Sequence, residues 1–94
     1  MPVGVLTLQL SIPACGSLKE KRSRLKPLLS RLQREFNLSA AEVDLQDVWQ
    51  SAVVQCALVS NDAVHVTRSL QQVVRWIETE WLDLEVEDDR IELY

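Results

Sequence analysis

Residues 17–37 read SLKEKRSRLKPLLSRLQREFN, and this stretch predicts a long amphipathic helix. Ser17 and Glu20 have the spacing of a capping box, in which both side chains satisfy backbone N–H groups at the start of a helix. The apolar residues that follow predict one buried stripe: Leu18, Leu25, Leu28, Leu29, Leu32 and Phe36. Pro27 interrupts this pattern and removes one backbone hydrogen bond, so a bend is expected there; a helix that restarts near Lys26 is the alternative.

Strand patterns lie on both sides of this helix. Alternating or continuous apolar runs predict four strands, at residues 3–12, 41–45, 52–59 and 84–94. The third run is apolar on both faces, which is typical of a central strand, and the parity of the last run changes near Asp88 and Asp89, which indicates a turn or bulge. A second amphipathic helix follows the cap formed by residues 60–62 and carries its stripe from Ala63 to Trp81.

The order βαββαβ predicts one α+β domain over residues 1–94. Two interleaved right-handed βαβ units give a ferredoxin-like sandwich, a four-stranded antiparallel sheet with both helices on one face. The other face would then carry Val5, Val53, Ala57 and Val59, although the third strand leaves its parity ambiguous. So much apolar surface predicts self-association, and we expect a homodimer.

Composition places the chain among small globular proteins. It has 94 residues, of which 47% are hydrophobic and 26% charged. No apolar run is long enough to span a membrane and the N-terminus lacks the pattern of a secretory signal, so a cytoplasmic location is expected. Cys15 and Cys56 are then free thiols, Cys56 in the core and Cys15 partly exposed. No ligand spacing suggests a metal, and no motif suggests a cofactor.

The net charge of −4 hides an asymmetry along the chain. Residues 1–40 carry seven basic and two acidic side chains, whereas residues 41–94 carry three basic and twelve acidic ones. All seven early positive charges lie between Lys19 and Arg34. The molecule is therefore dipolar, with a basic first helix and an acidic C-terminal part.

Lys21 falls inside the apolar arc of the first helix, in its first turn. One interpretation is an anion site in which Ser17 and the free N–H groups of the helix act with Lys21 and Arg22. In the predicted topology this edge also includes three residues of the connection between the second and third strands: Asp47, Trp49 and Gln50. The other interpretation is an internal salt bridge, and its candidate partners are Asp47, Glu80 and Glu85.

The outer side of the first helix predicts a second surface, for RNA backbone. It is formed by Lys19, Arg24, Lys26, Arg31 and Arg34. No aromatic platform is evident near these residues, so contacts would be made with phosphates. Trp49 is expected to pack against the start of the helix, Trp76 to mark an interface and Trp81 to join the core. Catalysis has little support, because His65 is an ordinary surface histidine in this pattern.

Several motifs resemble the YlxP-like family of small bacterial proteins of unknown function. The resemblance rests on six segments, Ser17–Arg22, Arg31–Arg34, Phe36–Ser39, Ala41–Val43, Asp47–Gln50 and Ser60–Asp62. It weakens after Trp81. It implies a ferredoxin-like fold and a cytoplasmic bacterial protein in the setting of translation initiation or ribosome maturation, and it implies no established activity.

The expected function is that of a non-enzymatic accessory protein that binds RNA or a ribonucleoprotein surface through the first helix. The alternative is a homodimeric protein-interaction module without nucleic-acid binding. An enzyme acting on a phosphorylated small molecule is the third possibility, since fold does not determine function.

Overall fold

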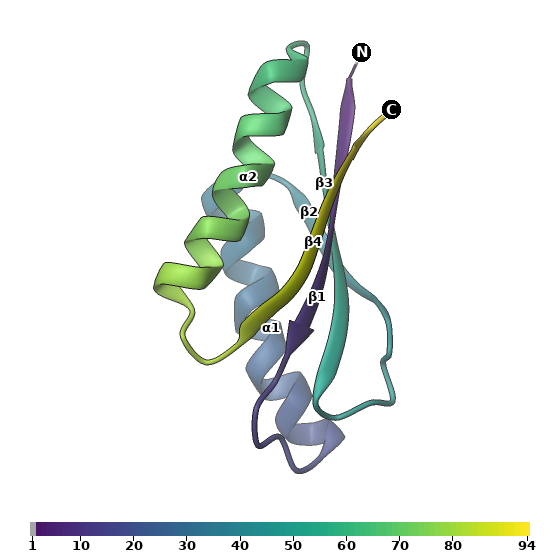
Figure 1. The fold of residues 1–94 in the computed structure, drawn as a ribbon, viewed down its shortest axis with the longest axis vertical. Helices are drawn as coiled ribbons and strands as arrows, with labels where there is room; N and C mark the ends of the chain where they lie inside the picture. The colour runs from purple at the N-terminus through teal and green to yellow at the C-terminus, as the bar shows by residue number, and fades with distance from the viewer. Residues whose placement is uncertain (1) are drawn as a thin grey trace.

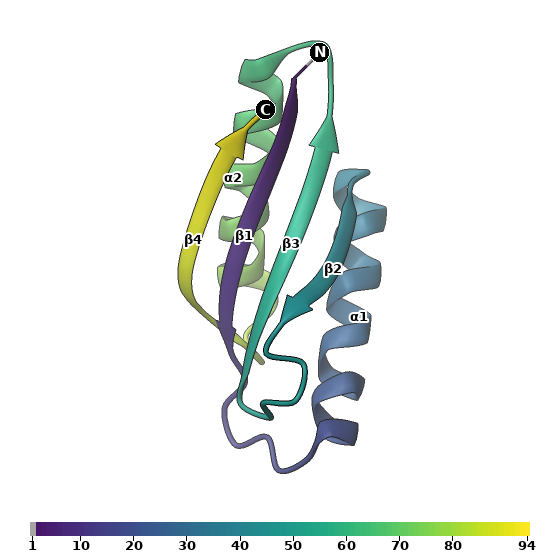
Figure 2. The same cartoon turned by 90° about the vertical axis from the view of Figure 1, so that its right-hand side faces the viewer.

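The computed structural model describes residues 2–94 and confirms the predicted order. The elements are β1 (Val3–Ser11), α1 (Leu18–Phe36), β2 (Ser39–Asp44), β3 (Ser51–Val59), α2 (Ala63–Glu80) and β4 (Glu85–Leu93). The strands form one antiparallel sheet in the order β2-β3-β1-β4. Both helices cover the same face of this sheet, and the other face is open (Figures 1 and 2). This is the ferredoxin-like α+β arrangement that the sequence predicts.

The helix boundaries have clear local causes. The Ser17 hydroxyl accepts a hydrogen bond from the Glu20 N–H at 3.0 Å, and Asn37 ends α1 in the left-handed region with φ of 51°. Asp62 caps α2 by accepting from the Val64 N–H at 2.9 Å. Pro27 lies inside α1, which runs as a single helix from Leu18 to Phe36 and does not restart near Lys26.

The core lies between the sheet and the helices. The inward side chains of β1 and β3 are buried there: Leu6, Leu8, Leu10, Ala52, Val54, Cys56 and Leu58. This settles the parity of β3, whose other side chains, including Gln55 and Val59, lie on the open face. Burial raises the pKa of the Cys56 thiol to about 12. Cys15 is also buried, contrary to the expected partial exposure, because its thiol turns inward and donates to the Ser17 carbonyl.

Both edge strands depart from regular pairing. In β4 the register shifts: Gln9 pairs with Asp88, but Leu10 pairs with Val86. Glu87 is therefore the extra residue of a bulge, one position before the predicted one. In β2 the register shifts between Glu42 and Asp44. Before this shift the pairing is regular: Ala40 lies opposite Cys56 and Glu42 opposite Val54, so both face inward, whereas the side chain of Val43 is exposed.

Gly4 allows α2 to lie close to β1. A Cβ atom at this buried position would overlap Val66 and would lie 2.8 Å from Leu70, and both are core residues of α2. Gly16 differs, since a Cβ atom there would be 3.7 Å from its nearest neighbour, the Glu20 carboxylate.

Gly4→Ala should therefore lower the free energy of unfolding by about 1–3 kcal/mol, because the helix must shift to admit the methyl group. Urea unfolding measures this, with Gly16→Ala as the control that should change stability by less than about 0.5 kcal/mol. Equal midpoints for the two variants would contradict the close packing at Gly4.

Candidate functional site

Lys21 is a buried cation with three oxygen partners. Its side chain is 1% exposed, and its ammonium lies 2.6 Å from the carbonyl oxygens of both Leu45 and Val48. Oε2 of Glu42 is 2.7 Å away. That oxygen is buried and has no hydrogen bond to the described residues, so its contact with Lys21 is an ion pair. The ammonium has three N–H donors and three neighbouring oxygens.

The internal salt bridge therefore forms, but its predicted partners are wrong. Asp47 is exposed, and Glu80 and Glu85 are also exposed on other elements. The acid is Glu42, because the regular pairing of β2 up to this residue places it opposite inward-facing Val54, on the face that α1 covers. The alternation of Ala41 and Val43 with acidic residues gives no signal of this, since it suggests that the acids face solvent.

The predicted anion-binding edge is assembled in space. The Ile12 N–H donates to the Gln50 carbonyl at 2.9 Å, and the Gln50 side chain reaches the Cys15 carbonyl at 3.5 Å. Arg22, Asp47 and Trp49 are exposed at the same edge. Lys21 is buried with its ammonium among three oxygens of the chain, so it does not present a charge to an external anion, and the Ser17 hydroxyl already serves as the helix cap. Anion binding here stays a prediction, and Arg22 is the cation available for it.

The predicted RNA face is divided by the packing of α1 between α2 and β2. Two of its five residues turn toward the α2 side, Arg24 beside Asp83 and Arg31 beside Trp76. The other three, Lys19, Lys26 and Arg34, are exposed and have no ion pair within residues 2–94. Arg22 is exposed in the same way. Arg22, Lys26 and Glu42 border a shallow groove of about 290 Å³ between α1 and β2.

Arg24 links two segments of the chain through its guanidinium. Its guanidinium lies 3.1 Å from the Asp83 carboxylate and donates to the backbone carbonyls of Pro13 and Asp83, both at 2.7 Å. The side chain is 17% exposed. These contacts join the β1–α1 connection to the segment after α2. The Arg24 guanidinium is therefore engaged within the chain, and its role in RNA binding stays a prediction.

Trp81 packs against the core as expected, whereas the other two tryptophans differ from expectation. The Trp76 ring packs at 5.8 Å from both Phe36 and Trp81, and the Arg31 guanidinium lies 5.6 Å from its centroid. Trp76 thus belongs to an intramolecular cluster between the helices. Trp49 is 49% exposed, so it is not buried against the start of α1. Periodicity could not show this, because Trp49 lies in a connection.

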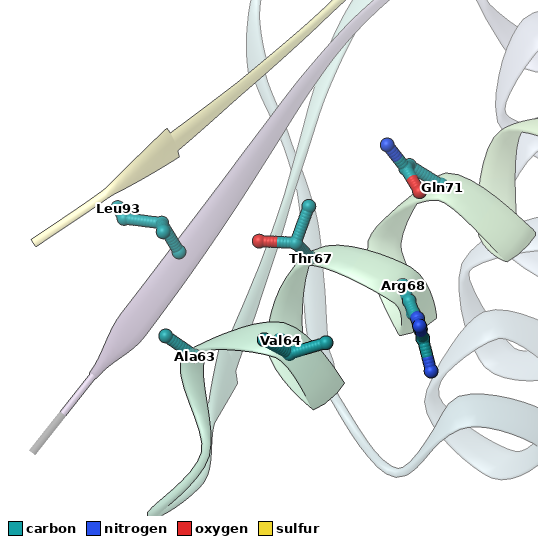
Figure 3. A pocket seen from close by; sticks show the side chains of 6 residues that line it. All are labelled: Ala63, Val64, Thr67, Arg68, Gln71 and Leu93. Carbon is teal, nitrogen blue, oxygen red and sulfur yellow. The ribbon is translucent and has the colours of Figure 1, made fainter.

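A further groove lies away from α1. A groove of about 370 Å³ lies between the first turns of α2 and Leu93 of β4, and Arg68 is the ionisable side chain that lines it (Figure 3). No group of three or more metal-ligating side chains occurs within residues 2–94. In that same range no helix is both long and apolar enough to cross a membrane.

The open sheet face is apolar over part of its length. Val3, Val5 and Ala57 are partly buried by their neighbours, and Val59 is 56% exposed. Farther along, the Gln55 amide donates to the Thr7 hydroxyl at 3.2 Å, which makes the middle of the face polar. Dimerisation through this face stays a prediction.

Replacing Lys21 should destabilise the fold strongly. Lys21→Met keeps the apolar stem but leaves two carbonyls and a carboxylate without their partner, so the free energy of unfolding should fall by about 3–5 kcal/mol. Lys21→Met combined with Glu42→Gln should recover about 1 kcal/mol or more of that loss, because the uncompensated charge is removed. Urea denaturation of the wild type, the single variant and the double variant measures both effects. An unchanged midpoint for Lys21→Met would contradict the stabilising role of the Lys21 ion pair and hydrogen bonds.

Comparison with known proteins agrees with the motifs. The family described as "Protein of unknown function (DUF503)" matches residues 3–91. A protein of Bacillus subtilis (strain 168) named "Uncharacterized protein YlxP" is 39% identical over 77 residues, which cover 82% of this chain and 84% of that protein. The resemblance seen in the sequence is confirmed: the chain belongs to the DUF503 family of proteins of unknown function.

Proposed function

We propose that this protein binds the phosphate backbone of RNA, free or in a ribonucleoprotein, through one side of α1. The binding surface, named here the basic face, consists of Lys19, Arg22, Lys26 and Arg34. One observation supports it above all: these four cations are exposed without a carboxylate partner within the described residues, whereas Lys21, Arg24 and Arg31 are paired. The translation setting implied by the family resemblance makes RNA the expected polyanion.

Binding through so few cations has a characteristic salt dependence. Three or four phosphate contacts release about as many counterions, so affinity should fall roughly 20- to 150-fold between about 50 and 200 mM salt. Sequence preference should be weak, because phosphate contacts carry no direct sequence information.

The test uses two matched double variants and fluorescence anisotropy with labelled ribosomal RNA fragments. Lys19→Glu/Lys26→Glu should weaken binding at least about tenfold and flatten the salt dependence, because two phosphate contacts become repulsive. Arg68→Glu/Arg75→Glu makes the same change in net charge, also seven residues apart, on exposed positions of α2. It should change affinity by less than about threefold. Equal losses for the two pairs, or salt-independent binding, would contradict the proposal.

A second candidate function is a homodimeric interaction module. Its support is the apolar end of the open sheet face, where Val59 is 56% exposed beside Val3 and Ala57. This face lies on the side of the sheet away from α1 (Figure 2). Dimerisation would therefore leave the basic face accessible.

Light scattering tests the dimer at a protein concentration of about 100 μM, where the wild type should show twice the monomer mass. Val59→Lys should shift the protein to the monomer, because a charge at the centre of the contact must lose its water. A wild-type protein that is monomeric at this concentration would exclude the module.

A further inference from the structure

Trp49 is the one tryptophan that presents half of its surface to solvent, since it is 49% exposed and the other two are packed with Phe36 and Arg31. Val48 beside it is 43% exposed. Both lie in the connection between β2 and β3, residues 45–50. An indole ring of this exposure is an energetic cost in isolation and is a frequent anchor in binding surfaces.

The backbone around Trp49 is held in place on both sides. Before it, the Lys21 ammonium donates to the carbonyls of Leu45 and Val48, and the Val48 N–H closes a turn onto Leu45 at 3.0 Å. After it, the Gln50 carbonyl accepts from the Ile12 N–H at 2.9 Å. A ring on such a loop loses little conformational entropy when a ligand packs on it.

These same bonds tie the loop of Trp49 to the first turn of α1, which also carries the N-terminal residues of the basic face. The partner of Val48 is Lys21, whose neighbour in the chain is Arg22, and the partner of the Gln50 side chain is Cys15, just before the start of α1. Figure 2 shows the connection beside the N-terminal half of α1. An exposed aromatic ring is thus carried by a loop that is bonded to the first turn of α1, next in the chain to Arg22.

We propose that Trp49 is a stacking platform for an unpaired base, so that the preferred ligand is single-stranded RNA. An unpaired base can stack on an indole while a flanking phosphate contacts Arg22 and the strand continues along the basic face. Bases of a duplex are already stacked and paired, so they gain nothing from the ring. The inference rests on the proposed function, because the cations of the basic face supply most of the binding; the ring selects the single strand.

The experiment compares three labelled probes at about 50 mM salt: an oligouridylate of about 12 nucleotides, an RNA duplex of the same length, and a strand of the same length made of abasic units. The wild type should bind the oligouridylate about tenfold more tightly than the abasic strand or the duplex. Trp49→Ala should remove this preference and leave duplex affinity and the salt dependence unchanged. Trp49→Phe should restore most of it, since a smaller ring still stacks. Urea midpoints confirm that the variants are folded.

The outcomes separate the two proposals. If Lys19→Glu/Lys26→Glu weakens binding of every probe but Trp49→Ala changes none, the platform is wrong and the basic face stands. If Trp49→Phe behaves like Trp49→Ala, the ring does not act by stacking and the platform is again wrong. If the wild type binds none of the probes, the proposed function fails and the platform fails with it.

Discussion

The ion pair and hydrogen bonds of Lys21 are the constraint on which the rest of the candidate site depends. Burying an ammonium without partners is prohibitively costly, so a lysine in the apolar stripe of α1 is tolerated because three oxygens surround it. Those oxygens come from β2 and from the β2–β3 connection. One side chain therefore fixes the start of α1, the edge strand and the loop that carries Trp49. The position of the loop follows from the need to neutralise a charge.

Which of the remaining basic residues find a partner within the chain depends on the position of α1 between α2 and β2. Its flank toward α2 meets Asp83 and the ring of Trp76, which engage Arg24 and Arg31. Its flank toward β2 meets a short strand whose inward acid, Glu42, already serves Lys21. The cations on that flank are consequently left without an internal partner. The positive charge of α1 that no other described residue neutralises is thus confined to one side of the helix.

The elements and their order could be predicted because period and capping are local properties: the alternation of residues 3–12, the box from Ser17 to Glu20 and the stripe of α1 are all visible in the chain. The burial of Lys21 was also predictable, since it lies within that stripe. Its partner was not, because the apolar residues Ala41 and Val43 suggest that their side of β2 faces the core, whereas in the structure Glu42 faces inward and Val43 is exposed. Likewise the contacts of Arg24 with Pro13 and Asp83 could not be predicted, because they depend on the path of the chain after α2. The exposure of Trp49 could not be predicted either, because it lies in a loop, which periodicity does not describe.

The acidic C-terminal part of the chain argues less strongly against a polyanionic ligand than its composition suggests. The sheet order β2-β3-β1-β4 places β4 at the edge opposite β2, beside which the basic face lies. Three strand spacings separate these edges by about 14 Å, which exceeds the Debye length of about 8 Å at physiological salt. Most of the repulsion between the carboxylates of β4 and a phosphate at α1 is therefore screened. The nearer acids matter more, and among them Glu42 is neutralised by Lys21 and Glu20 accepts from the Gly16 N–H. Asp47, exposed in the connection two residues before Trp49, is the acid that a bound strand would have to avoid.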